Sequence, residues 1–439
     1  MIIPAPGGFG AGARSRLLPA SVTLRYFGAA VAFHVLAWLA LLDGAGGLLR
    51  FAAYGGLGPA LAALHLVTLG VLTMTALGAT LQLLPVATRQ PVRSLAAVKL
   101  AWWLLAPGVA LFALGAAAYH PALLGLGAAG VVAALALYGW LLAENLRRAR
   151  GMPVVVAHGW AALAALALFA AAGLALVAHY EHGLALDRSA IATAHLVLAA
   201  YGFMGLLALG LSQFLVPMFA LSPAPPAGSA YAALGMALGA IALALGAIAA
   251  HMPHLLAGAA LLGLASALLH VISIERALRR RLRPALGPAF QLARSAWACL
   301  LGSLVLAVLI PLGWAPPRAA ALFGVLLVAG WLLGFVLAML QRIVPFLATV
   351  HAAGGGRGAP LVSSFTPQRP LALHRVLHLT ALILLLAGVA ADAEWLIRTA
   401  AALGLAGALA YATFFAWVLA RLHEARLKEK TQHGLQSAN

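Results

Sequence analysis

Charged residues are scarce in this chain of 439 residues. Asp, Glu, Lys and Arg make up 8 % of it and hydrophobic residues make up 64 %, whereas soluble domains average about 25 % charged and about 45–50 % apolar residues. The apolar stretches recur along the whole length. The composition therefore excludes a soluble domain with one anchor and predicts an all-α integral membrane protein.

Cysteine and acidic residues are almost as rare. Cys299 is the single cysteine, which excludes an intramolecular disulfide, a Cys-x-x-Cys motif and covalent haem attachment. The chain has nine acidic residues and 27 Lys and Arg, which gives a formal net charge of +18. Because the basic residues lie between the apolar stretches, we attribute them to membrane topology and anionic lipid rather than to nucleic acid.

About twelve apolar runs are long enough to cross a bilayer, for which a helix needs roughly 20 residues. We predict membrane helices over residues 22–42, 58–86, 97–117, 121–145, 154–179, 189–219, 230–250, 255–275, 288–313, 318–348, 371–390 and 396–421. The N-terminus leads into a full-length apolar run with no small-residue cleavage site after a short apolar core, so we expect an uncleaved first helix rather than a removed signal peptide.

The basic residues predict which side each loop faces, because cytoplasmic loops are enriched in Lys and Arg. With a cytoplasmic N-terminus, only four of the 27 basic residues face outward: Arg50, Arg188, Arg318 and Arg398. We therefore predict a bacterial inner-membrane protein with both termini in the cytoplasm. It would consist of an N-terminal segment (1–21), one membrane domain (22–421) and a basic tail (422–439).

The second, sixth and tenth predicted helices share a pattern of glycines, then a glutamine, then a proline. The glutamines and prolines are Gln82 and Pro85, Gln213 and Pro217, and Gln341 and Pro345. The prolines are 132 and 128 residues apart, which is four helices. We expect three parallel four-helix repeats (22–145, 154–275 and 288–421) in a pseudo-threefold bundle.

A purely structural interpretation of these residues stays open. Glycine allows close helix packing, and a glutamine amide can satisfy the carbonyls that a proline leaves free.

Histidines inside membrane spans are rare and point to function by default. His65 and His195 lie six or seven residues into the second and sixth helices from the outer face, roughly 10 Å deep at about 1.5 Å per residue. They occupy matching places in two repeats, and His34 lies at a comparable depth in the first helix. The alternative is a buried neutral histidine bonded to a carbonyl.

Other histidines could bind a metal. His374 and His378 are one helical turn apart, but beside Arg375 at a helix start they are more typical of a solvated or lipid-facing pair. The outer loops contain His120, His179, His182, His251 and His254. Imidazole suits copper and zinc, but no acidic cluster or tight spacing supports a closed site there.

Twelve helices in three parallel units, with a histidine high on the second helix, resemble the catalytic subunit of heme-copper oxidases. The helix strings look like the diverged subunit-I-like proteins related to its C-type branch and to nitric oxide reductase. The nitric-oxide-response membrane proteins, described as containing haem and copper, are a more distant resemblance. The resemblance implies that His65 binds a low-spin haem and that His195 stands where the family has a copper ligand.

The chain departs from this family at the catalytic centre. Residues 323–346 contain no histidine, and the seventh helix has none before His251. We therefore expect no reduction of dioxygen or nitric oxide. We predict one low-spin haem with His65 and His195 as axial ligands, or His34 in place of His195. Copper is a further candidate cofactor. Four glycines would make room for the macrocycle: Gly70, Gly78, Gly202 and Gly210.

Three functions remain open. The favoured one is a haem protein of electron transfer, respiratory assembly or nitric-oxide response, whose partners are the bilayer and respiratory or assembly proteins. The second is a transporter or permease for a small solute or metal ion. The third is a haem-copper reductase. Arg294 and Arg342 are nearly the only charged residues within spans, too few for a proton-coupled pump.

Overall fold

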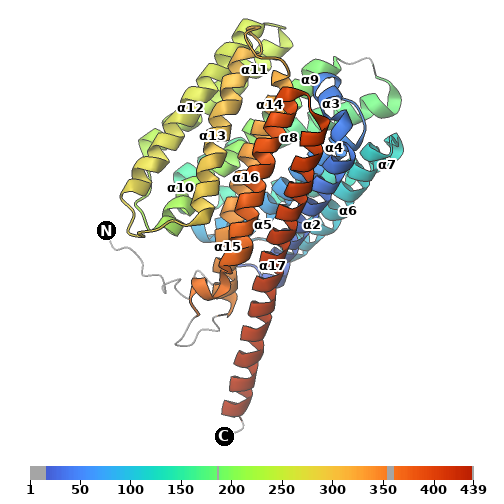
Figure 1. The fold of residues 1–439 in the computed structure, drawn as a ribbon. Coiled ribbons are helices and arrows are strands. Elements are labelled where there is room, and N and C mark those ends of the chain that lie inside the picture. Colours follow the sequence, from blue (N-terminus) through green and yellow to red (C-terminus); the bar gives the residue numbers. More distant parts are fainter. Residues whose placement is uncertain (1–15, 185–186, 353–359, 438–439) are drawn as a thin grey trace.

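The chain folds into a bundle of long helices, as a computed structural model shows (Figure 1). It describes residues 16–184, 187–352 and 360–437, and these contain no strand. Twelve helices are long and apolar enough to cross a membrane. The predicted all-α membrane fold is therefore confirmed. Most of the predicted N-terminal segment and the side chain of His433 lie outside the described residues.

The predicted spans match the observed helices, with every predicted start within three residues of an observed one. The spans are α2 (Ala20–Asp43), α4 to α5 (Pro59–Ala87), α6 (Leu95–Ala117), α7 (Pro121–Arg147), α8 (Pro153–His182), α9 to α10 (Arg188–Ala220), α11 (Ala227–Ala249), α12 (Pro253–Arg279), α13 (Pro288–Leu309), α14 to α15 (Ala319–Ala352), α16 (Gln368–Ala391) and α17 (Glu394–Ser437). Only α17 is much longer than predicted, and it projects beyond the bundle (Figure 1).

The helix starts follow from local sequence. α7, α8, α12 and α13 all begin with proline, which is favoured there because the first-turn amides have no partner within the helix. Ser94 and Asp187 accept hydrogen bonds from the amides of Ala97 (3.1 Å) and Ala190 (3.0 Å) at the starts of α6 and α9.

Three kinds of helix contact recur three times along the chain. The pairs α6 and α7, α11 and α12, and α16 and α17 form hairpins. α2, α8 and α13 each pack against the membrane span that follows them, which is α4 to α5, α9 to α10 and α14 to α15, respectively. α7 packs on α8, α12 on α13, and α17 back on α2, which closes a ring. Whether the three units superpose by rotation remains a prediction.

The second helix of each unit lies inside the ring. These three spans are 72 %, 56 % and 61 % buried, against 28–44 % for the others. Each contains a π-helical segment: η2 (Leu66–Thr73), η3 (Val197–Gly205) and η4 (Val325–Leu333). All three segments end twelve residues before the proline of their helix. π-Helices are rare and frequently occur at functional sites.

The glycines of these segments allow close packing. A Cβ atom on Gly70, Gly202 or Gly330 would lie 2.7 Å from a side-chain atom of the unit's first helix. The structural interpretation of these glycines therefore holds. Within the described residues, in contrast, the glutamines make no hydrogen bond to a carbonyl freed by proline. Each amide faces a histidine: Gln82 and His351 (3.4 Å), Gln213 and His270 (3.1 Å), and Gln341 and His374 (3.2 Å).

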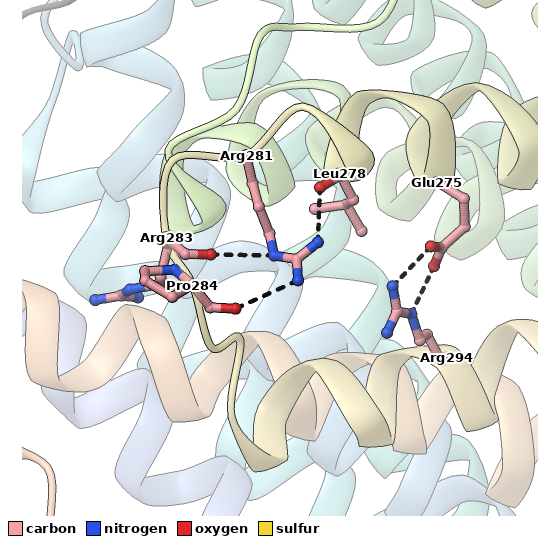
Figure 2. A network of polar contacts seen from close by, with 6 residues as sticks. All are labelled: Glu275, Leu278, Arg281, Arg283, Pro284 and Arg294. Atoms are coloured by element: carbon pink, nitrogen blue, oxygen red, sulfur yellow. Dashed lines mark hydrogen bonds and ion pairs between the residues drawn. The ribbon is translucent and has the colours of Figure 1, made fainter.

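The basic loop after α12 is folded back on itself (Figure 2). The Arg281 guanidinium donates to the carbonyls of Leu278 (3.1 Å) and Arg283 (3.0 Å) at the end of α12. Arg294 on α13 makes two 2.7 Å hydrogen bonds to the Glu275 carboxylate on α12 (Figure 2). One of the few charges within a span is thus neutralised by a bidentate ion pair.

Candidate functional site

A cavity of about 900 Å³ lies among the three inner helices. We call it the central cavity. Its walls come from α3 (Leu48–Tyr54), η2, η3 and η4 and from the surrounding helices α7, α8, α11, α12 and α13, and most of its lining residues are apolar. Cofactor and small-molecule sites are typically apolar and about 300–1,000 Å³ in volume. The central cavity is therefore the candidate functional site.

His65 and His195 both line the central cavity. His65 Nδ1 lies 3.1 Å from the carbonyl of Leu61, and His195 Nδ1 lies 2.9 Å from the carbonyl of Phe169. A neutral imidazole that donates from Nδ1 keeps a lone pair on Nε2. Within the described part of the chain, neither Nε2 has a hydrogen-bond partner. Metal-bound histidines are usually oriented by such a bond from their other nitrogen.

The two histidines are approximate rather than strict counterparts. His65 is 20 residues before Pro85, whereas His195 is 22 residues before Pro217. At the same two distances before Pro345 the third unit has Val325 and Phe323, and both line the cavity. Two units therefore contribute an imidazole, and the third contributes apolar wall.

Room beside His195 comes from Gly173 on α8, where a Cβ atom would lie 3.1 Å from His195 Cε1. The four glycines expected to make room for a macrocycle do not do so. A Cβ on Gly78 would lie 2.9 Å from Tyr26 Cβ, and one on Gly210 would lie 2.5 Å from His158 Cβ. Like Gly70 and Gly202, they face neighbouring helices, so that expectation was wrong.

One end of the central cavity contains an arginine. Arg188 Nη2 donates to the carbonyl of Tyr54 at 2.7 Å, and Nη1 lies 3.4 Å from the Tyr180 hydroxyl. Among the described lining residues, Arg188 is the only Lys, Arg, Asp or Glu. The cavity thus combines a long apolar body with a cation at one end.

The structure does not place His34 in the central cavity. Trp38 lines the cavity, and its Nε1 donates to His34 Nε2 at 3.0 Å. His34 lies behind this indole, among the side chains of His374 and Tyr411. It therefore has no access to an iron held by His65 unless Trp38 moves.

His374 and His378 are buried, with 0 % and 3 % exposure. The interpretation of this pair as solvated or lipid-facing was wrong, because α16 turns that face toward α2, α15 and α17. The loop histidines are dispersed: His120 caps α7, and His251 pairs with Asp187 at 3.7 Å. No group of three or more His, Cys, Asp or Glu within the described ranges is placed to hold a metal ion.

Sequence reasoning did not single out His270, His351, Tyr411 or the role of Arg188. His270 on α12 is buried, and its ring lies within hydrogen-bond distance of Ser212 Oγ (3.1 Å) and Gln213 Nε2 (3.1 Å) on α10. Its position within a predicted span was visible in the sequence, and the default expectation of function for such residues applies to it.

No family model matches this chain, and no curated protein is significantly similar to it in sequence. What the site can do chemically must therefore be argued from its own residues. They provide two oriented imidazoles, an apolar cavity lining and one arginine.

Proposed function

We propose that this chain is a haem-binding membrane protein in which His65 and His195 bind one iron through Nε2. The observation that carries the proposal is that two imidazoles on different helices line one apolar cavity, each held by an Nδ1 hydrogen bond to a carbonyl. Two axial histidines make a six-coordinate haem, which suits electron transfer rather than gas binding.

The rest of the central cavity fits an amphipathic ligand of this kind. Its apolar walls match a macrocycle, and Arg188 stands at one end as a partner for propionate groups. In the structure Arg188 Nη2 donates to the Tyr54 carbonyl. Exchange of that acceptor for a carboxylate would give a charge-assisted hydrogen bond, which is shorter and stronger.

The cellular role that follows is electron transfer, respiratory assembly or nitric-oxide response in a bacterial inner membrane, with both termini in the cytoplasm. The resemblance to diverged heme-copper oxidase subunits supports this role. A transporter would use the same cavity for a solute that passes through. Retention of haem through purification separates the two functions.

Absorbance spectra of purified variants test the proposal. The wild type should show the Soret and α bands of six-coordinate, low-spin haem. His65→Ala and His195→Ala should each lose that spectrum, because one axial ligand is removed. His34→Ala and the loop variant His120→Ala should keep it. A wild type that purifies without haem, or a His65→Ala protein with the native spectrum, would disprove the proposal.

A second test concerns Arg188. Hydrogen bonds to charged groups contribute about 1.5–3 kcal/mol, so Arg188→Gln should release haem to apomyoglobin roughly 10- to 100-fold faster. Arg50 on α3 is an exposed arginine that does not line the cavity, and Arg50→Gln is the matched control. Equal haem-release rates for the two variants would show that Arg188 does not bind the propionate groups.

A further inference from the structure

A second polar cluster lies behind Trp38, outside the central cavity. It consists of His34 on α2, Gln341 on α15, His374 and His378 on α16, and Tyr411 on α17, and we call it the His374 cluster. All five side chains are at most 3 % exposed.

Most of the unpaired polar atoms in the protein interior belong to this cluster. Eight buried side-chain nitrogen or oxygen atoms in the described residues have no hydrogen-bond partner. Five of them are in the cluster: His34 Nδ1, Gln341 Oε1, His374 Nε2, His378 Nε2 and Tyr411 Oη. An unpaired buried polar group costs about 1–3 kcal/mol. Five such atoms in one cluster, contributed by four helices, therefore indicate a site that binds a ligand.

The spacing of the two α16 histidines suits a metal ion. His374 and His378 are four residues apart on one helix face, the arrangement of helical zinc ligands. Their ring centroids are 5.5 Å apart. Two imidazoles bound at ~2.0–2.1 Å to one ion have centroids roughly 5–6 Å apart, depending on the angle at the metal. The centroid of the Tyr411 ring lies 4.9 Å from that of His374, and the Tyr411 hydroxyl has no hydrogen-bond partner among the described residues.

Gln341 and Trp38 decide which nitrogens are available. Gln341 Nε2 lies 3.2 Å from His374 Nδ1. Half a turn of this amide, which exchanges its nitrogen and oxygen, lets Nδ1 donate to Oε1 and leaves a lone pair on His374 Nε2. His34 accepts from Trp38 through Nε2, so its Nδ1 carries the proton. His34 is therefore a hydrogen-bond donor to the site rather than a ligand.

We infer that the His374 cluster binds one late transition-metal ion, copper or zinc, through Nε2 of His374 and His378. Imidazole nitrogen suits both metals. The cluster contains no acidic residue or cysteine, so a low ionic charge is favoured at this depth because charge within a membrane is costly. Cu⁺ is therefore preferred to Zn²⁺. This site goes beyond the proposed haem and does not depend on it, because Trp38 separates the two.

Metal binding to the full-length protein, prepared without a histidine tag, tests the inference. The wild type is equilibrated with Cu⁺ under ascorbate or with Zn²⁺, desalted, and assayed by elemental analysis. We expect about one tightly held ion per chain, with a preference for copper. His374→Leu and His378→Leu should bind at least tenfold more weakly. Gln341→Leu should bind the metal roughly 10- to 100-fold more weakly, as is found for other residues that orient a metal ligand.

The controls separate this site from the loops and from the haem. His254→Ala, at the exposed start of α12, should bind copper as the wild type does. His65→Ala should lose the haem spectrum but keep the ion, so failure of one proposal is distinguishable from failure of the other. Equal copper affinity in His378→Leu and wild type would overturn the inference, as would a wild type that retains neither metal.

X-ray absorption at the bound metal keeps the inference testable if the leucine variants fail to fold. Scattering from two imidazoles should surround the ion in the wild-type protein. A spectrum without imidazole scattering, or one unchanged in Gln341→Leu together with unchanged affinity, would contradict the assignment.

Discussion

His65, His195 and His158 share one local feature, an Nδ1 contact with a backbone carbonyl. For His65 and His158 the acceptor is four residues earlier on the same helix, at 3.1 and 2.8 Å, whereas His195 reaches Phe169 on α8. His158 nevertheless packs against Gly210 and does not line the central cavity. The bond fixes the tautomer of an imidazole, but its surroundings decide whether Nε2 can bind a ligand.

The space beside His195 gives a prediction at the residue scale. Gly173→Val would place a Cβ atom 3.1 Å from His195 Cε1, so the ring must turn, and its Nε2 could then no longer bind the proposed haem iron. Most of the haem should become five-coordinate and bind carbon monoxide in the ferrous state, as measured by absorbance. Gly235, where a Cβ atom meets nothing within 4 Å, provides the control Gly235→Val. A Gly173→Val protein whose haem is six-coordinate and does not bind carbon monoxide would contradict the prediction.

At the scale of elements, the π-helical segments set the shape of the central cavity. η2 and η3 each pack on η4, and all three contribute lining residues. A π turn has an extra residue, which changes the direction of the side chains that precede it relative to those that follow. The side chain of Thr73 shows this wide turn, because its hydroxyl donates to the carbonyl of Thr68, five residues earlier, at 2.8 Å.

The packing of η3 on α8 yields a prediction at this scale. Gly202→Leu would place its Cβ 2.7 Å from Ala165 Cβ, and overpacking typically destabilises by about 1–3 kcal/mol. Gly202→Leu should lower the temperature at which half of the protein is no longer monodisperse. Gly246→Leu, at an open position on α11, should leave this temperature unchanged. Equal midpoints for both variants would show that Gly202 is not a close-packing position.

At the scale of the whole molecule, twelve spans place residues 182 and 280 at opposite ends of the bundle. In a Cys299→Ala background, His182→Cys should react with an impermeant maleimide in cells whose outer membrane is permeabilised, because the basic loops are expected inside. Arg280→Cys should react only after the inner membrane is opened. Labelling of position 280 in the intact inner membrane would overturn the predicted orientation.

The sequence by itself determined the twelve spans, because a helix that crosses a bilayer needs about 20 apolar residues and these are consecutive in the chain. It also determined the helix starts, through proline and capping residues, and it identified His65 and His195 as polar groups within the membrane spans. Each of these features depends on residues close together in the chain.

Only the tertiary structure decided which faces meet. One partner of Gln82 is His351, 269 residues away, and the acceptor for His195 is on another helix. The burial of His374 and His378 likewise depends on how α16 is rotated. Hydropathy sets helix length but not rotation, which is set by packing against helices from distant parts of the chain.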